Sequence, residues 1–186
     1  MIPPGRFPGE GPRRPTRPGG GEGDMMEQHE LHMTLNGASR VLPCEPDAPL
    51  LDVLRHGAGL SGPRFGCGLG LCGACFVLID GQARSSCDLP AWAAEGRLVT
   101  TLEGLMDGET LDAVQRAFID EQAAQCGYCT SGMVVSAVAL LRVSPSPSEQ
   151  EVREALDGNL CRCGAHGRIV RAVMKAASET DGQASG

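Results

Sequence analysis

Residues 65–75 have the sequence Phe65-Gly-Cys-Gly-Leu-Gly-Leu-Cys-Gly-Ala-Cys75, in which three cysteines have the spacing C-x4-C-x2-C. Thiolates are soft ligands that suit iron–sulfur clusters, zinc or copper(I). This spacing is typical of plant-type [2Fe–2S] sites, which take a fourth cysteine from farther along the chain. The predicted ligands of this first site are Cys67, Cys72, Cys75 and Cys87.

Glycines lie between these cysteines and support the same interpretation. A loop that wraps a cluster must adopt positive φ angles and bring its backbone close to sulfide, and glycine does both without steric cost. A zinc site or a disulfide-closed loop is the alternative, but zinc sites favour two separated cysteine pairs without a glycine-rich loop. The pattern therefore favours a [2Fe–2S] cluster. The cluster-loop glycines are Gly66, Gly68, Gly70 and Gly73.

A second group of cysteines lies nearer the C-terminus, in Gln125-Cys-Gly-Tyr-Cys129 and Asn159-Leu-Cys-Arg-Cys-Gly164. Each motif falls between two predicted helices, so two loops at one end of a bundle can supply two thiolates each. A four-thiolate zinc site that clips the helices together is the alternative, and C-x-C is unusual for either metal. The first site on the same chain favours iron. The predicted ligands of a second [2Fe–2S] cluster are Cys126, Cys129, Cys161 and Cys163.

The composition of the chain narrows its class. Its 186 residues are 41% hydrophobic but only 3% aromatic, which predicts a core of aliphatic side chains. The formal net charge of −7 argues against a nucleic-acid partner or a polybasic membrane surface. Nine cysteines, an odd number with tight pairs, indicate metal ligation rather than a secreted disulfide framework. The remaining one, Cys44, is expected to be a partly buried structural thiol.

The N-terminal segment 1–28 is rich in Gly, Pro and Arg and is expected to be disordered, because it cannot bury enough apolar surface to offset its ordering entropy. Translation starts at Met1, Met25, Met26 or Met33 are all compatible with the sequence. No run approaches the roughly 20 apolar residues of a membrane span, and no signal peptide is evident. A cytoplasmic location is therefore expected, with export alongside a partner left open.

Residues 29–105 are expected to form a small α+β domain. Asn36-Gly37 and Asp80-Gly81 favour hairpin turns, and the second hairpin would bring Cys87 back beside the cysteine loop. Asp47 is expected to cap a short helix over residues 50–54. Apolar periodicity predicts strands over residues 31–35, 38–42, 74–79, 82–87 and 97–102.

Beyond residues 106–109 the apolar period becomes helical, which predicts a four-helix bundle over residues 106–178 and a disordered tail over 179–186. In the first helix Leu111, Val114, Phe118 and Ile119 follow helical spacing, which predicts an inward-facing apolar side. Ser148-Glu-Gln-Glu151 is a capping box that opens the third helix. The four helices are expected over residues 111–119, 130–143, 149–157 and 168–178.

Four cysteine-bearing segments, taken in order, closely resemble those of the iron–sulfur subunits of the xanthine oxidase family of molybdenum hydroxylases. They are residues 66–75, Cys87, residues 125–129 and residues 161–164. The resemblance covers about residues 29–178, and its motifs are highly specific. Residues 118–126 and 159–166 are most similar to the small subunits of nicotinate dehydrogenase and isoquinoline 1-oxidoreductase. His166 departs from the Thr-Gly-Tyr ending common in xanthine dehydrogenases, which affects the expected substrate and acceptor but not the clusters.

The resemblance implies a β-grasp, plant-type ferredoxin domain followed by a four-helix-bundle [2Fe–2S] domain. It implies that the second cluster is the one nearest molybdenum, and that Gln125 and Cys163 contact a molybdopterin held by a large partner subunit. Electrons from the hydroxylation would pass through both clusters to a cytochrome c domain or an FAD subunit, and no catalytic residue is expected on this chain. A free ferredoxin-type carrier and a zinc-clipped interaction module are the alternatives.

Overall fold

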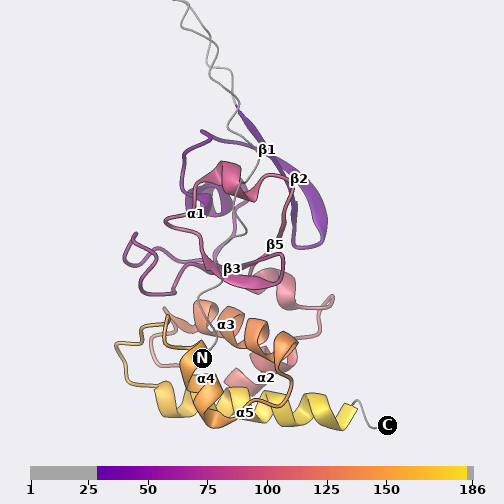
Figure 1. Cartoon of the computed structure of the whole chain (residues 1–186), viewed down its shortest axis with the longest axis vertical. Coiled ribbons are helices and arrows are strands. Elements are labelled where there is room, and N and C mark those ends of the chain that lie inside the picture. Colours follow the sequence, from indigo (N-terminus) through magenta and orange to yellow (C-terminus); the bar gives the residue numbers. More distant parts are fainter. Residues whose placement is uncertain (1–28, 184–186) are drawn as a thin grey trace, which may run out of the picture.

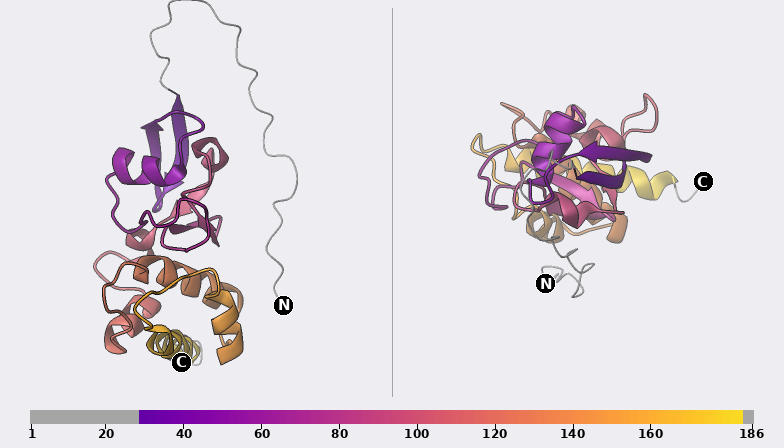
Figure 2. Two further views of the ribbon diagram at one scale, coloured as in Figure 1. Left: turned by 90° about the vertical axis from the view of Figure 1, so that its left-hand side faces the viewer. Right: turned by 90° about the horizontal axis from the view of Figure 1, so that it is seen from above.

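The computed structural model describes residues 29–183 of the chain, with side chains as far as Glu179. The predicted disorder of residues 1–28 lies outside the described residues, as do Met25 and Met26. The described part consists of a half built on a β-sheet and a half built of helices, which Figures 1 and 2 show stacked one on the other. This order of a mixed α+β unit followed by a helical unit was predicted from the sequence.

The first half contains one mixed sheet with the strand order β2-β1-β5-β3-β4. Strands β1 and β5 are parallel, and the other neighbours are antiparallel. Alternate residues of β1, namely Leu31, Met33 and Leu35, are buried and begin the core of this half. The strands are β1 (Glu30–Leu35), β2 (Ala38–Pro43), β3 (Phe76–Ile79), β4 (Gln82–Ser85) and β5 (Leu98–Thr100).

The short helix of this half is only partly as expected. Helix α1 covers Leu50–Asp52 and continues as a π-helical turn over Val53–Gly57. The N-cap position belongs to Pro49, and no side chain caps the helix, so the prediction that Asp47 caps it was wrong. Proline fixes its own φ and is compatible only with the start of a helix, which delays the first turn until Leu50.

The helical half contains α2 (Ala113–Asp120), α3 (Thr130–Val143), α4 (Glu149–Ala155) and α5 (His166–Gln183). The capping box of α4 is present, because Glu151 N–H donates to Ser148 Oγ and Ser148 N–H donates to the Glu151 carboxylate. Helix α5 continues to Gln183, beyond the tail boundary predicted at 179. Between residues 29 and 183, no helix combines the length and the apolar character needed to cross a membrane.

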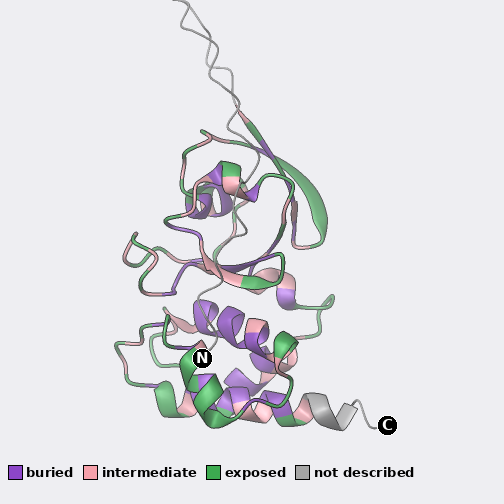
Figure 3. Ribbon diagram, in the orientation of Figure 1, coloured by how far each residue is buried: buried purple, intermediate pink, exposed green. Residues whose placement is uncertain are grey.

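Helix α3 lies at the centre of the molecule, between the sheet and the other helices, and is buried along almost its whole length (Figure 3). Val135 of α3 is fully buried, and the helix contacts both β3 and β4. Ile119 of α2 was expected to face inward and is 64% exposed. It lies one residue past Phe118 and so points about 100° away from that buried side chain.

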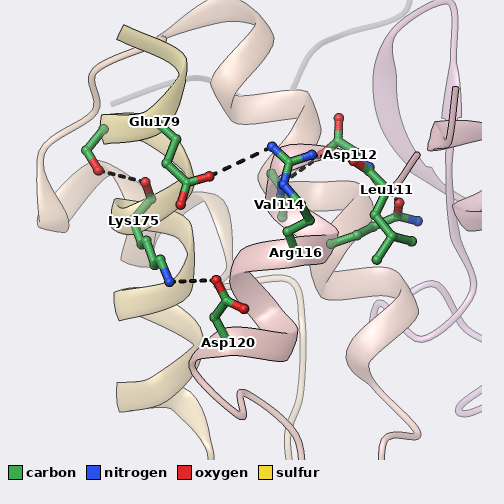
Figure 4. Close-up of polar contacts among 9 residues, drawn as sticks. Leu111, Asp112, Val114, Arg116, Asp120, Lys175 and Glu179 are labelled. Atoms are coloured by element: carbon green, nitrogen blue, oxygen red, sulfur yellow. Dashed lines mark hydrogen bonds and ion pairs between the residues drawn. The ribbon is translucent and has the colours of Figure 1, made fainter. Parts of the chain in front are cut away.

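Ion pairs connect α2 with α5, as Figure 4 shows. Lys175 Nζ lies 2.7 Å from an Asp120 carboxylate oxygen, and Arg116 lies 3.8 Å from Glu179. Exposed pairs of this kind contribute little free energy individually. The apolar core shared by α2, α3 and α5 therefore supplies most of the attraction between these helices.

Glu103 connects the end of the sheet to the segment that leads into the cysteine loop. Its carboxylate accepts hydrogen bonds from the N–H groups of Ser61 and Gly62 at 3.0 and 2.6 Å, and from the Thr101 hydroxyl at 2.7 Å. Burial raises the pKa of Glu103, but these donors outweigh it and hold the pKa below its ordinary value. The ionised carboxylate therefore stabilises this corner of the fold.

We expect Glu103→Gln to lower the free energy of unfolding by about 1–3 kcal/mol at neutral pH, because the amide replaces a charged acceptor of several hydrogen bonds. A carboxyl whose pKa is lowered by folding stabilises the protein above its ordinary pKa, and this contribution is lost as pH falls through the lowered value. In urea denaturation, the difference from the wild type should therefore shrink below about pH 4. The exposed Glu109→Gln is the control, and a difference that stays constant down to about pH 3 would contradict the prediction.

Candidate metal centres

The loop of residues 65–75 has the backbone conformation expected around a cluster. Gly68, Gly70 and Gly73 have φ angles of 69°, 69° and 70°, a region that other residues rarely adopt. Gly66 is needed for space instead, because a Cβ added there would lie 2.6 Å from Cys72 Sγ. Each of the predicted cluster-loop glycines thus occupies a place where a larger residue would be strained or would clash.

Backbone N–H groups of this loop point at the cysteine sulfurs. The N–H groups of Leu69 and Leu71 donate to Cys67 Sγ at 3.4 and 3.2 Å. These two bonds lower the pKa of Cys67 to about 7, so that the thiolate is well populated near neutral pH. Two further bonds run from Cys67 N to Cys72 Sγ at 3.4 Å and from Gly70 N to Cys87 Sγ at 3.3 Å. Donors arranged in this way stabilise negative charge on cluster sulfurs.

The cysteines approach one another in pairs. In residues 29–183, no three or more His, Cys, Asp or Glu side chains converge tightly enough to surround one metal ion. Two irons that share bridging sulfides need two thiolates each, whereas one zinc ion needs its four ligands in a single tetrahedron. Thiols that approach two and two are compatible with a [2Fe–2S] cluster, in which each iron takes two thiolates. The pairs are Cys67 with Cys72, Cys75 with Cys87, Cys126 with Cys163, and Cys129 with Cys161.

The second set of cysteines surrounds a narrow cavity between the loop before α3 and the loop before α5. Burial raises the pKa of Cys129 to about 11, although this residue lies at the N-cap of α3, where the helix dipole favours a thiolate. The pKa of Cys126 is lowered by a hydrogen bond from Tyr128 N–H. Iron would favour the thiolate form at both positions. The cavity is lined by Cys126, Cys129, Cys161 and Cys163 together with Gln125, Thr130 and Ile169.

Gln125 and Cys163, the predicted molybdopterin contacts, line this same cavity. Gln125 is exposed and Cys163 is partly exposed, so both are accessible to a group on another chain. Cys44 packs against the core of the sheet half, and burial raises the pKa of its thiol. This position agrees with a structural thiol.

The two sites meet at a junction that the sequence analysis did not predict. Leu160 N–H donates to the carbonyl of Cys72 at 3.0 Å, which connects the two cysteine-bearing loops through their backbones. On the same side, Asn159 Nδ2 donates to the carbonyl of Gly73 at 3.4 Å. Asn159 lies two residues before the C-x-C motif, but nothing in the local sequence predicts that its side chain contacts Gly73, 86 positions earlier in the chain.

A second set of contacts joins the loop to the C-x2-C motif. Arg64 donates to the carbonyl of Gly127 at 2.7 Å, and its guanidinium lies 5.4 Å from the centre of the Tyr128 ring. The Tyr128 hydroxyl donates to the carbonyl of Phe65. Residues 64–73 are therefore fixed against both motifs of the second site.

Two protein families match the chain, one over each half. Residues 33–101 match a family described as a 2Fe-2S iron-sulfur cluster binding domain, and residues 101–174 match one described as a [2Fe-2S] binding domain. The match across both halves agrees with the two sites seen in the structure. It also confirms the prediction of two [2Fe–2S]-binding domains.

Named relatives match this chain over nearly their whole length. It is 52% identical over 150 residues to a nicotinate dehydrogenase subunit of Pseudomonas putida, covering 81% of this chain and 96% of the relative. It is 51% identical over 150 residues to the alpha subunit of isoquinoline 1-oxidoreductase from Brevundimonas diminuta, covering 80% and 98%. Both enzymes were named in the predicted resemblance, which is confirmed.

Solved structures show the same arrangement. A chain of quinoline 2-oxidoreductase from Pseudomonas putida matches with a TM-score of 0.80 and 43% identity, covering 84% of this chain and 97% of that one. The aldehyde oxidoreductase of Desulfovibrio desulfuricans matches with a TM-score of 0.79 and 41% identity, but the match is only 17% of that much longer chain. The chain described here therefore belongs to the xanthine oxidase family of molybdenum hydroxylases, as an iron–sulfur subunit that carries two [2Fe–2S] clusters and transfers electrons.

Proposed function

We propose that the ferredoxin-like half, a β-grasp domain, and the four-helix bundle formed by α2–α5 each hold one cluster. The pairing of thiols and the N–H groups directed at sulfur support this assignment. The first cluster would be held by Cys67, Cys72, Cys75 and Cys87. The second would be held by Cys126, Cys129, Cys161 and Cys163.

When bound, the clusters supply one-electron carriers between an external acceptor and a molybdenum cofactor on a large partner protein. The contribution of this chain is to hold its two sites close together and to direct donors at their sulfurs. The observation that carries the proposal is the hydrogen bond from Leu160 N–H to the Cys72 carbonyl. Cys72 is a proposed ligand of the first site, and Cys161, a proposed ligand of the second, follows Leu160 directly. A single backbone hydrogen bond therefore links the two proposed ligand loops.

We assign the molybdenum side to the edge of the second site at which Gln125 is exposed and Cys163 is partly exposed. The acceptor side would lie at the first loop, where Phe65, Leu69 and Leu71 are 58%, 68% and 67% exposed. Exposed apolar side chains around a redox site suit contact with another protein. That protein would carry a cytochrome c haem or an FAD.

An N-heteroaromatic compound is the proposed substrate class of the assembled enzyme. The relatives with more than half of their residues identical bear the names of nicotinate and isoquinoline enzymes. An aldehyde is the second candidate, because the iron–sulfur subunit of an Escherichia coli aldehyde oxidoreductase is 38% identical. A cytoplasmic location is proposed as well, because eight of the nine cysteines are proposed as cluster ligands, and cysteines that bind metal rather than form disulfides are typical of a reducing compartment.

The function is tested by purifying the native chain together with its bound partners. We expect about four iron atoms and four labile sulfides per chain, visible absorption, and a large subunit that contains molybdopterin. A colourless chain that contains zinc would support the zinc-clipped module instead. A coloured chain that elutes alone in size-exclusion chromatography would support a free ferredoxin-type carrier.

Gln125→Ala should leave both clusters in place but weaken the contact with the large subunit's cofactor. We expect about a tenfold fall in the rate of electron transfer from substrate to the second cluster, the effect of losing one well-placed hydrogen bond. Stopped-flow absorption of the assembled enzyme measures this rate, and iron analysis checks the clusters. Gln150→Ala, on the exposed face of α4, is the matched control. Loss of iron from the Gln125 variant would show a structural role instead.

A further inference from the structure

Asn159 is buried at the point where the two halves of the molecule meet, and only 3% of its surface is exposed. Its side-chain Nδ2 donates to the carbonyl of Gly73, which lies between Cys72 and Cys75. Its own backbone belongs to the turn after α4 and leads into Cys161. A single side chain thus connects the loop of the first site with the loop of the second.

The backbone at Gly73 and Gly132, beside Asn159, leaves no room for a Cβ atom. A Cβ added at Gly73 would lie 2.3 Å from Asn159 Nδ2, and one added at Gly132 would lie 1.9 Å from the Gly73 carbonyl oxygen. The Cβ at Gly132 would also lie 3.3 Å from Asn159 Nδ2. The Gly73 carbonyl is therefore enclosed between the first turn of α3 and the Asn159 amide.

The other end of the Asn159 amide has no hydrogen-bond partner among the described residues, although Oδ1 is buried. An unpaired buried acceptor costs free energy, and an apolar side chain of similar size would avoid that cost. General stability therefore does not account for asparagine at this position. The donor at Nδ2, aimed at the Gly73 carbonyl, is the feature that an apolar residue would not supply.

We propose that Asn159 is a positioning residue for electron transfer, whose amide fixes the first loop against the second and so sets the separation of the two clusters. This inference rests on the proposed cluster ligands. The step that it serves is a one-electron exchange, in which one site is oxidised and the other is reduced by the same electron. The rate of such an exchange depends on how closely the two sites are held.

The test uses the assembled enzyme with Asn159→Leu, which keeps the approximate size but removes the donor, and Asn159→Asp, which replaces the donor by an acceptor. Asp157→Asn alters an exposed side chain of the same turn and is the matched control. After full reduction with dithionite, both clusters are paramagnetic, so electron paramagnetic resonance detects their separation as a spin–spin splitting. Iron content and the midpoint potential of each cluster are measured on the same samples.

We expect both Asn159 variants to keep about four iron atoms per chain, and Asn159→Leu to keep unchanged midpoint potentials, while the spin–spin splitting shrinks in both. Hydrogen exchange at the Leu160 amide should speed up about tenfold, the size of effect that one buried hydrogen bond carries. Unchanged splitting in variants with full iron would overturn the inference, and so would loss of iron from both of them. A wild-type chain without two clusters would instead overturn the proposed function. The Asp variant preserves the size and shape of the side chain and removes only the donor, so the comparison stands even where the Leu variant does not fold.

Discussion

Cys72→Ala should lower the iron content from about four to about two atoms per chain and stop electron transfer to the protein acceptor. The Cys72 thiol is paired with Cys67 and accepts the Cys67 N–H at 3.4 Å, so it lies inside the proposed first site. The carbonyl of residue 72 still accepts from Leu160 in the variant, because only the side chain is changed. The loss should therefore be confined to the first cluster.

The measurements are iron analysis, absorption spectroscopy and turnover with substrate in the assembled enzyme. Reduction of the second cluster by substrate should continue, while steady-state turnover with the natural acceptor should fall by at least about a hundredfold. Cys44→Ala is the control, because Cys44 lies in the same half but outside the site, and it should retain full iron content. Normal turnover in the Cys72 variant would contradict the order of transfer proposed here.

Gly132→Ala should have the second large effect, on the way the two halves fit together. The added Cβ would lie 1.9 Å from the backbone oxygen of Gly73, and distances under 3.0 Å are essentially never observed for a real Cβ. Because the obstructing atom is backbone, no change of side-chain rotamer relieves the clash, and the halves must move apart. We expect the free energy of unfolding to fall by about 2 kcal/mol or more, which is typical of overpacking in a rigid core.

Gly167→Ala provides a control with the opposite expected sign. Gly167 lies in α5, and a Cβ added there would meet nothing within 4 Å. Alanine is the better helix former, so this variant should gain up to about 1 kcal/mol. Thermal or urea denaturation of both variants separates the two cases, and equal stability of Gly132→Ala and the wild type would contradict the close approach of α3 to the loop.

Local features were predictable because they depend on neighbouring residues. The hairpin at Asn36-Gly37, the capping box at Ser148 and the bounds of α3 follow from turn preferences, side-chain capping and apolar spacing. The cysteine motifs also indicated two metal sites, because their spacing limits which ligand sets are possible. How the thiols pair within each set depends on the folded loops and could not be inferred from spacing.

Features that depend on distant contacts were missed. The bond between Asn159 and Gly73 joins residues 86 positions apart, and neither residue differs in type from an ordinary turn residue. The burial of most residues of α3 reflects the sheet that packs on this helix, which helical periodicity alone does not reveal. Asp47 is an error of the opposite kind, in which a local signal was given too much weight. Aspartate is a common helix cap, but Pro49 occupies the N-cap position of α1.

The contact between Gly73 and Gly132 also bears on how proteins of this kind can be recombined. Since the backbone of the first half approaches the backbone of α3 at this point, a chimera that takes its halves from two relatives inherits one contact that no side-chain rotamer can relieve. We expect such a hybrid to need glycine at position 132 wherever the other half approaches α3 as closely as it does in this chain. Modular exchange of the two halves is thus constrained by one small residue rather than by the cysteines.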